Sequence, residues 1–316
     1  MESRFGPVVT VTLNTAIDRT LFIKDFVWNK TIRSSLSVVG MGGKATDASW
    51  ILGELGVANT ALGFAAGDVG QQIDRMLRLR GTDTDFVWVK GETRTNIVVV
   101  SEQGKGQSTL ISGGLEITAE DCAFFKEKFH WAIQKAGCVV IGGSVPSDLE
   151  VSIYTEMVKD VREFNIPVIF DASGSSLIAG MEGKPNFAKP NLDELGELSG
   201  TKITGIRAAY DEARQLQEKY GTSFIITLGE LGALAILGDR AYHIPPLKMR
   251  VVSTAGAGDG VLAGLAAAIA QGKSTEDGLR LGFAAAAAVC LTPATADCRR
   301  ADVEALLPKI QLLPYP

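Results

Sequence analysis

Residues 138–146 read "CVVIGGSVP", an apolar run that ends in two glycines, a serine and a proline. Such a short β-branched run is typical of a strand that is buried on both faces, as in a parallel sheet. Comparable runs lie at 8–13, 96–100, 167–171, 223–227 and 233–237. Helical spacing of apolar residues is found at 46–55, 70–80, 119–135, 150–164, 206–219, 259–271 and 276–291. This alternation predicts an α/β protein with a mostly parallel central sheet covered on both faces.

Two segments, at about 20–40 and 85–112, contain short strand patterns without an intervening helix. We expect them to form a small antiparallel sheet that acts as a lid on a single domain, residues 1–316. Apolar residues in the first segment, such as Phe22, Phe26 and Trp28, would need a cover. A homodimer through the lid would supply one, and packing on the core would serve equally well.

Composition excludes several classes of protein. The 316 residues carry a net charge of −5, which gives no electrostatic reason to expect a nucleic-acid or membrane partner. The four cysteines are scattered, with no CxxC pair or metal-ligand spacing, as expected for reduced thiols. The start, "MESRFGPVV", lacks the pattern of a signal peptide, and the apolar stretch 281–291 is too short to span a membrane. We therefore expect a soluble cytoplasmic protein.

Small and polar residues follow the predicted strands, where ligands of open parallel sheets bind. "NTAID" (14–18) follows the first strand, "GGSVP" (142–146) follows another, and "DASG" (171–174) ends a third. "TLGELG" (227–232) lies after the next strand, and "GAGDG" (256–260) precedes a predicted helix. The sequence therefore predicts a ligand site at this edge of the sheet.

The most informative of these motifs is "STAGAGDGVLAG" (253–264). Gly256 and Gly258 let a ligand approach the main chain, and a helix that begins near Asp259 would direct free amides and a positive dipole end at an anion. Ionised there, Asp259 could accept the proton of a hydroxyl group. An anion cradle beside a carboxylate base is what phosphoryl transfer from a nucleotide to an alcohol requires. Taken alone, the motif fits a glycine-rich turn with Asp259 as helix cap equally well.

Two further motifs also allow two interpretations. Asn191 and Glu194 in "KPNLDEL" (189–195) could share a helix face and hold the water shell of a metal ion or a phosphate. In isolation, a helix-capping pair is the better interpretation of them. Thr227 and the glycines that follow it suit either close passage of a nucleotide or a tight hairpin.

Histidine chemistry and dinucleotide binding are both disfavoured. His130 and His243 are the two histidines, and neither has a serine or cysteine arranged with it, so we expect a carboxylate base. The GxGxxG spacing of dinucleotide-binding loops is not met after Gly256, because Val261 stands in place of the third glycine.

Together these motifs resemble those of the ribokinase-like (PfkB) carbohydrate kinases. "TAGAGDGVLAG" is similar to the C-terminal signature of that family, and "GMGGKATDAS" (40–49) is similar to its N-terminal signature. "TLNTAIDRTLFI", "TRTN", "GGSVP", "DASG", "KPNLDEL" and "TLGELGAL" are most similar to the branch of 1-phosphofructokinase and tagatose-6-phosphate kinase, in order from about residue 8 to 290. The resemblance implies a three-layer α/β/α ribokinase-like fold with a β-sheet lid, and an ATP-dependent kinase.

The resemblance implies a role for each motif. Asp259 would deprotonate the acceptor hydroxyl, and the amides of Gly256, Ala257 and Gly258 would stabilise charge on the transferred phosphoryl group. The residues that would bind sugar hydroxyls are Asp18, Gly42, Gly43 and Asp47. Those that would bind a phosphate already on the substrate are Lys44, Arg94 and Ser144. Those that would line the ATP site are Lys189, Asn191, Thr227, Gly229 and Gly232, with Glu194, and Asn191 through water, organising Mg²⁺.

Three departures from that branch lie on the acceptor side. "GGKATD" has Ala45 and Asp47 where the branch has glycine and asparagine, and Thr15 replaces a usual proline. The third departure is in "STLISGG" (108–114), which lacks the usual glutamate. As a carboxylate, Asp47 accepts but does not donate, and it adds charge near an anionic substrate.

We expect an ATP- and Mg²⁺-dependent kinase of a ketose phosphate: fructose 1-phosphate, fructose 6-phosphate or tagatose 6-phosphate. The same chemistry on an unphosphorylated sugar, a polyol or a nucleoside is one alternative. A catalytically weak sugar- or nucleotide-binding protein on the same scaffold is the other.

Overall fold

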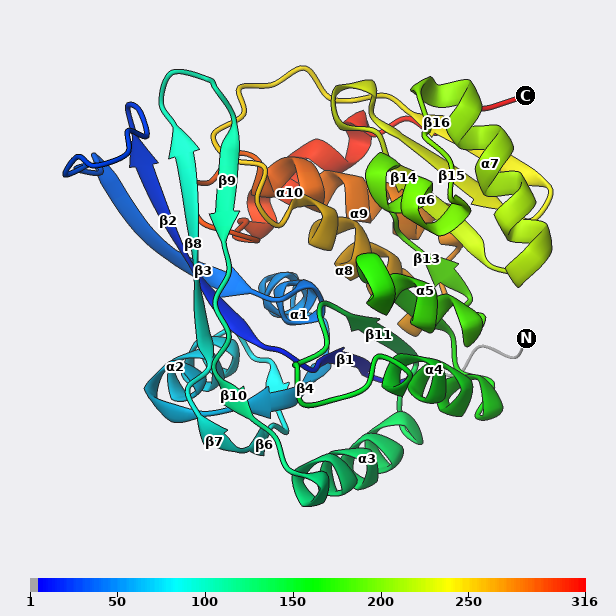
Figure 1. Ribbon diagram of the computed structural model, residues 1–316. Helices are drawn as coiled ribbons and strands as arrows, with labels where there is room; N and C mark the ends of the chain where they lie inside the picture. Colours follow the sequence, from blue (N-terminus) through cyan, green and yellow to red (C-terminus); the bar gives the residue numbers. More distant parts are fainter. Residues whose placement is uncertain (1–4) are drawn as a thin grey trace.

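The computed structural model describes residues 5–316, which form a three-layer α/β/α body and a smaller second sheet (Figure 1). The main sheet of the described chain has eleven strands, in the order β17 (Leu313–Pro314), β16 (Arg240–Ile244), β15 (Ala233–Leu237), β14 (Ser223–Thr227), β13 (Phe187–Ala188), β12 (Val168–Asp171), β11 (Cys138–Gly142), β1 (Val8–Thr12), β4 (Asn59–Ala65) and β5 (Asp83–Thr84), with β6 (Val87–Trp88) also on β4. Strands β14 to β5 are all parallel, and only the β14–β17 end is antiparallel. The expected mostly parallel sheet is confirmed.

Helices cover both faces of this sheet. One face carries α3 (Ala119–Ile133), α4 (Ile153–Glu163), α5 (Gly174–Glu182), α6 (Leu192–Ser199) and α7 (Gly205–Tyr220). The other carries α1 (Lys44–Glu54), α8 (Ala257–Ala270), α9 (Thr275–Val289) and α10 (Arg300–Leu306). Helix α2 (Gly67–Leu79) packs on β4 and the base of the second sheet. Within residues 5–316, no helix has the length and apolarity needed to cross a bilayer.

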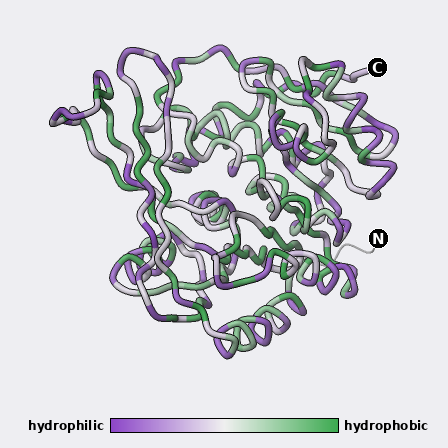
Figure 2. Tube along the Cα trace, viewed as in Figure 1, coloured by the Kyte–Doolittle hydropathy of each residue, from purple (hydrophilic) through white to green (hydrophobic). Residues whose placement is uncertain are grey.

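The central strands are apolar throughout because their alternate side chains enter two separate cores. Val9 and Val11 of β1 pack with Val139 of β11 under α3 and α4, whereas Val8 and Val140 pack under α1 and α8. All five are almost completely buried. Figure 2 shows apolar segments in the interior and polar ones along the outer turns. The period-two geometry of a strand thus explains the uninterrupted apolar runs in the sequence.

The second sheet, called the lid sheet here, has the strand order β3-β2-β8-β9. Its strands are β2 (Ala16–Ile23), β3 (Leu36–Gly42), β8 (Arg94–Ser101) and β9 (Gln107–Leu110). The expectation of an antiparallel sheet is wrong for the central pair, because β2 and β8 run parallel. Both strands leave the main body in the same direction, and β3 and β9 return antiparallel to them. Residues 83–88 belong instead to the edge of the main sheet, and β7 (Lys90–Gly91) pairs with β10 (Leu115–Glu116).

Helices α8 and α9 pack at very short range because glycines face each other across the contact. A Cβ on Gly264 would overlap the backbone of Gly282, and one on Gly260 would lie 2.6 Å from the Ala286 nitrogen. This approach keeps α8 close to the sheet and fixes the position of its first turn.

We predict that Gly264→Val lowers the free energy of unfolding by about 3 kcal/mol, because the added methyl groups must separate the two helices. Gly113→Val is the matched control, since its Cβ would meet no atom within 4 Å. That control should change stability by less than about 0.5 kcal/mol. Urea denaturation of both variants measures the difference, and equal losses would contradict the close-packing account.

Candidate active site

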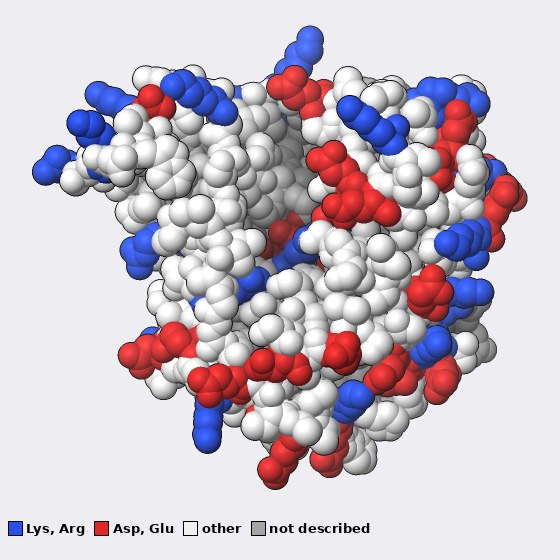
Figure 3. Space-filling view, in the orientation of Figure 1, with Lys and Arg blue, Asp and Glu red and all other residues white. Residues whose placement is uncertain are grey.

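A hollow lies between the lid sheet and the main body, and acidic and basic atoms meet at its floor (Figure 3). The carboxyl ends of β1, β11, β12 and β14 and the first turns of α1 and α8 carry the residues singled out from the sequence. The sheet edge predicted to bind a ligand is therefore the edge where those motifs gather.

The first turn of α8 is shaped by Gly256, the residue before the helix. Gly256 has a φ of 80°, and a Cβ there would overlap the backbone nitrogen of Ala296. That nitrogen donates to the Ala255 carbonyl at 3.1 Å, so a neighbouring loop clamps the turn. Glycine is needed at position 256 both for the left-handed backbone and for this close approach.

The amides of Gly256 and Gly258, at the start of α8, remain available to a ligand, whereas those of Ala257 and Asp259 are already bonded. Ala257 donates to the Thr254 carbonyl at 3.2 Å, and Asp259 donates to the Gly256 carbonyl at 3.1 Å. The amides of Gly256 and Gly258 have no acceptor in the described part of the chain. The Lys189 ammonium lies beside Gly258, where it is 2.9 Å from the position of a Cβ. A helix N-terminus, free amides and a cation together form an anion cradle.

Asp171 organises the charged groups next to this cradle. It ends β12, is 1% exposed, and lies between two ammonium groups: Lys44 at 2.7 Å from Oδ1 and Lys189 at 2.8 Å from Oδ2. Burial alone would raise the pKa of Asp171, but Lys189 and Lys44 outweigh it and the pKa is lowered. Asp171, the first residue of "DASG", has no role among those expected from the sequence. It could have been predicted as a site residue, because it is a carboxylate at the end of a buried strand.

Lys44 bridges the two halves of the site. Its Nζ also lies 3.0 Å from Glu194 Oε1. Burial would lower the pKa of Lys44, but Asp171 and Glu194 raise it overall, so the ammonium stays charged. Lys44, expected to bind a substrate phosphate, is thus paired with two carboxylates. Arg94 and Ser144, expected to bind the same phosphate, are instead hydrogen-bonded to Asn14.

Asn191 and Glu194 form a capping box at the start of α6. Glu194 N donates to Asn191 Oδ1 at 2.8 Å, and Asn191 N donates to Glu194 Oε2 at 2.9 Å. This arrangement is the capping pair that the sequence also allowed. Because Oε1 of Glu194 still faces Lys44, the side chain caps the helix and also faces the site.

The residues expected near the nucleotide lie next to this cap. Thr227 at the end of β14 pairs with Asn191 in a single parallel bridge, and Thr227 N donates to the Pro190 carbonyl at 3.1 Å. Gly229 begins a 3₁₀ turn that Gly232 follows. The structure therefore brings Thr227, Gly229 and Gly232 to one edge with Asn191.

On the acceptor side, strand register brings Asp18 and Asn96 together. Asp18 of β2 lies opposite Asn96 of β8 and Gly40 of β3, and Asn96 Nδ2 donates to Asp18 Oδ1 at 2.8 Å. The Asp18 carboxylate also lies so close to Gly42 that any side chain there would overlap it. Burial raises the pKa of Asp18, and the Asn96 amide offsets part of that rise. Asn96 was not predicted as a site residue, because the pairing of β2 with β8 cannot be inferred from the sequence.

A second acceptor-side contact joins Arg94, Asn14 and Ser144. Arg94 Nη2 donates to the Asn14 carbonyl at 3.3 Å, and Asn14 Nδ2 donates to Ser144 Oγ at 3.2 Å. Arg94 Nε is buried and has no hydrogen-bond partner in the described residues. Burial lowers the pKa of Arg94. A partly buried guanidinium with a free Nε donor fits an anionic group of a ligand.

Asp47 and Gly43 lie at the start of α1, beside the cradle. Gly43 precedes the helix, and Thr46 N donates to Thr12 Oγ1 of β1 at 2.8 Å, which fixes the first turn. Asp47 is 4% exposed and lies next to Asp259, which is 8% exposed. Burial, with a smaller contribution from Asp171, raises the pKa of Asp259 to about 7 against the lowering effect of Lys189 and Lys44. A carboxyl group titrating there suits a general base.

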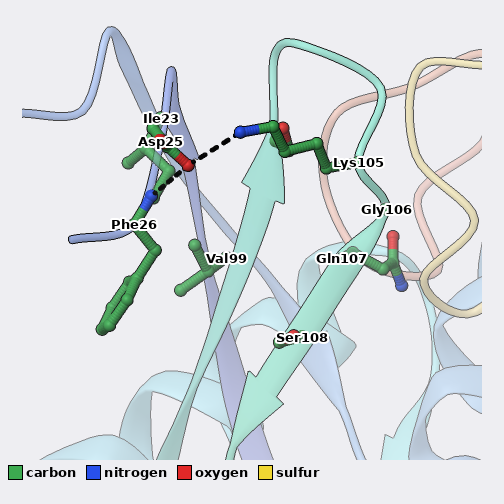
Figure 4. Close-up of a pocket in the computed structure, with 9 residues that line it drawn as sticks. Ile23, Asp25, Phe26, Val99, Lys105, Gly106, Gln107 and Ser108 are labelled. Atoms are coloured by element: carbon green, nitrogen blue, oxygen red, sulfur yellow. Dashed lines mark hydrogen bonds and ion pairs between the residues drawn. The ribbon is translucent and has the colours of Figure 1, made fainter. Parts of the chain in front are cut away.

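A separate small pocket lies at the far end of the lid sheet (Figure 4). It is lined by Ile23, Phe26, Val99 and Lys105, and Lys105 Nζ lies 3.1 Å from Asp25 Oδ1. Asp18 and Asn96 lie at the opposite ends of the same strands. The pocket is therefore distinct from the cluster described above.

A family model described as "pfkB family carbohydrate kinase" matches residues 11–302. This range includes every motif described above. The chain belongs to the pfkB family of carbohydrate kinases.

Two relatives and one solved structure agree with the family. This kinase is 34% identical to 1-phosphofructokinase of Bacillus subtilis over 306 residues, which cover 96% of this chain and 99% of that protein. It is 29% identical to tagatose-6-phosphate kinase of Staphylococcus epidermidis, over 86% of this chain and 88% of that one. Ribokinase of Arabidopsis thaliana has a TM-score of 0.74 at 23% identity, over 96% and 99% of the two chains, which shows a shared fold. The expected ribokinase-like fold and sugar-kinase class are confirmed.

We predict that Lys189→Met lowers the free energy of unfolding by about 3 kcal/mol, because it removes one of the two cations that neutralise a buried carboxylate. Lys126→Met is the control: Lys126 pairs with Glu156 at 2.6 Å, but both side chains are about half exposed. That surface pair should contribute less than about 1 kcal/mol. Guanidinium denaturation near neutral pH compares them. A loss for Lys189→Met no larger than that of the control would show that the buried pair is not structural.

Proposed function

We propose that this kinase transfers the γ-phosphoryl group of ATP to a hydroxyl group of a ketose phosphate, with Asp259 as the general base. The observation that carries the proposal is the position of Asp259. It lies in the first turn of α8, one residue after a free amide and in the same buried cluster as two ammonium groups. Phosphoryl transfer to an alcohol needs these three elements together.

In this mechanism each group has one task. Asp259 takes the proton of the acceptor hydroxyl as that oxygen bonds to the γ-phosphorus and the bond to the leaving ADP oxygen breaks. The amides of Gly256 and Gly258 donate to the transferred phosphoryl oxygens, and Lys189 adds positive charge beside them. The helix holds the two amides and Asp171 holds Lys189 before the substrate arrives, which lowers the cost of reorganisation.

We further propose that Mg²⁺ binds with the nucleotide beside Glu194, with Asn191 acting through water. Magnesium prefers oxygen ligands and is commonly held by one or two carboxylates together with substrate phosphates. Glu194 Oε1 fits that donor set, whereas both Asp171 oxygens are paired with the ammonium groups of Lys44 and Lys189. No group of three metal-ligating side chains exists within residues 5–316, so the phosphates would complete the shell. There the ion would neutralise phosphate charge, and the ion pair with Lys44 would keep the Glu194 carboxylate in place.

A phosphorylated acceptor is supported by Arg94, whose buried Nε has no partner among the described residues. Its guanidinium can bind a phosphate in the bidentate manner, with Asn14 and Ser144 beside it. Asp18 and Asn96 can bind the sugar hydroxyl groups. The relatives named 1-phosphofructokinase and tagatose-6-phosphate kinase support a ketose phosphate. A neutral acceptor is the second candidate, because the carboxyl groups of Asp18 and Asp47 are close enough for Asp18 to raise the pKa of Asp47.

A dimer through the lid sheet and a cytoplasmic location stay predictions. The lid carries exposed apolar side chains, among them Phe26, Trp28, Leu110 and Ile111. A second copy of the chain would cover them.

The test is ADP release by the purified protein with MgATP across a panel of acceptors. The panel contains fructose 1-phosphate, fructose 6-phosphate, tagatose 6-phosphate, free hexoses, ribose, inositol and nucleosides. We expect turnover on one phosphorylated ketose. Turnover on a neutral acceptor only would support the second candidate, and no turnover on any of them would argue for a binding protein.

We predict that Asp259→Asn lowers kcat by at least about a thousandfold, because the hydroxyl loses its proton acceptor. Nucleotide affinity should change little, since the amide keeps the size of the side chain. Steady-state kinetics and calorimetric titration with a nucleotide analogue measure the two effects. A variant that keeps more than about a tenth of the wild-type kcat would exclude Asp259 as the base.

The raised pKa of Asp259 predicts an acid limb in the pH profile. A base with a pKa of about 7 is protonated and inactive below that pH, so kcat/KM should rise as pH increases through about 7. Initial rates between about pH 5 and 8 measure this limb. A profile that is flat down to about pH 5 would show that no base with a raised pKa is used.

A further inference from the structure

The Asp47 carboxyl group is buried and incompletely hydrogen-bonded. Asp47 lies in the first turn of α1, is 4% exposed, and its Oδ1 has no hydrogen-bond partner among the described residues. Helix α1 packs directly against α8, and this contact sets Asp47 beside Asp259. A buried carboxylate oxygen without a donor is costly, whereas a protonated carboxyl group in the same place is tolerated.

The charged groups around Asp47 bear on whether its carboxyl group is protonated or ionised. It faces two carboxyl groups, Asp259 on α8 and Asp18 on β2. The nearby cations are engaged elsewhere: Lys44 and Lys189 bind Asp171. Arg94, on β8, acts on Asp18. Among residues 5–316, no cation is therefore a cause of the pKa shift of Asp47, although Lys189 and Lys44 both act on its neighbour Asp259.

Two adjacent buried carboxyl groups cannot both ionise easily. Burial raises the pKa of Asp47 well above its usual value, and Asp259 and Asp18 raise it further. Lys189 and Lys44 lower the pKa of Asp259 and so favour its ionised form. Both effects favour an arrangement in which the pair's remaining proton is on Asp47 and its negative charge is on Asp259.

We propose that Asp47 is a positioning residue that works as a neutral carboxylic acid, donating its hydroxyl hydrogen to Asp259 and so holding that base as a single, oriented carboxylate. The inference rests on the proposed role of Asp259. It resolves the difficulty of placing Asp47 near an anionic substrate, because the pair carries one negative charge instead of two. A carboxylic acid donates one hydrogen bond, as the amide of asparagine does.

The pair then sets an alkaline limit for the enzyme. When the shared proton leaves at high pH, a second negative charge appears beside the acceptor and the transferred phosphoryl group. Repulsion between this charge and the phosphoryl group lowers kcat/KM, and Asp259 no longer accepts a hydrogen bond from Asp47. In Asp47→Asn the amide donates at every pH, so the wild-type alkaline limb should be absent.

The first test uses stability and needs no activity. The unfolded chain loses the Asp47 proton near pH 4, whereas the folded chain keeps it to a higher pH. The folded state therefore binds more protons in this window, and its stability falls as pH rises through it. The gain in Tm of Asp47→Asn over the wild type should grow from about pH 5 to pH 8. Asp239→Asn, at an exposed turn, is the control and should show no such growth.

The second test is the kcat/KM profile of the wild type, Asp47→Asn and Asp259→Asn on the acceptor found by the panel. We expect the Asp47→Asn profile to lack the alkaline limb, whatever its kcat/KM near neutral pH, while Asp259→Asn stays inactive throughout. An Asp47→Asn variant with the wild-type alkaline limb and no pH-dependent gain in Tm would overturn the inference and leave the proposed function standing. A wild type inactive on every acceptor would instead overturn the proposed function, and the Tm experiment alone would then decide where the proton resides.

Discussion

One buried carboxylate sets the position of the other charged groups in this site. Asp171 is held between Lys44 from α1 and Lys189 from the loop after β13, and through Lys44 it is linked to Glu194 on α6. Removing so many charges from water is favourable only when each finds a partner. The ends of a strand, a loop and two helices are therefore fixed relative to one another by mutual neutralisation. The first turn of α8 joins the same cluster because Lys189 lies beside Gly258.

A loop late in the chain links this cluster to the lid sheet. Residues 292–297 contact Gly256 through Ala296 and Gly40 of β3 through Thr295, in both cases too closely for any side chain at the glycine. Asp297 holds the loop in place, since its carboxylate lies 2.6 Å from Arg80, whose guanidinium stacks 3.5 Å above the Trp50 ring. The anion cradle and the lid thus rest on one anchored segment.

The sequence was informative wherever a local pattern determined the outcome. The buried strands and the longer helices lie within a few residues of their predicted positions, and the motifs after the strands gather at one edge. Elements with a weak local pattern were missed: α5 begins "GSSLIAG", whose glycine and serines are poor helix formers, and β4 reads "NTALGFA" with little alternation. Partners far apart in sequence were not predictable either. Asn96 meets Asp18, and Lys44 meets Asp171, only because tertiary packing joins them.

The lid sheet and the proposed acceptor side are parts of one hydrogen-bonded sheet. Asp18 lies near the start of β2, Gly42 at the end of β3, and Arg94 and Asn96 at the start of β8, so three of the four lid strands carry these residues at their inner ends. Phe26 and Trp28, which are exposed, lie in the turn between β2 and β3 at the outer end, whereas Leu110 lies opposite Ile97, near the inner end of β8. A force on the outer end would be transmitted along hydrogen-bonded strands to the proposed sugar contacts. In evolution, a change in what that turn touches and a change in which sugar is accepted would then be mechanically connected traits.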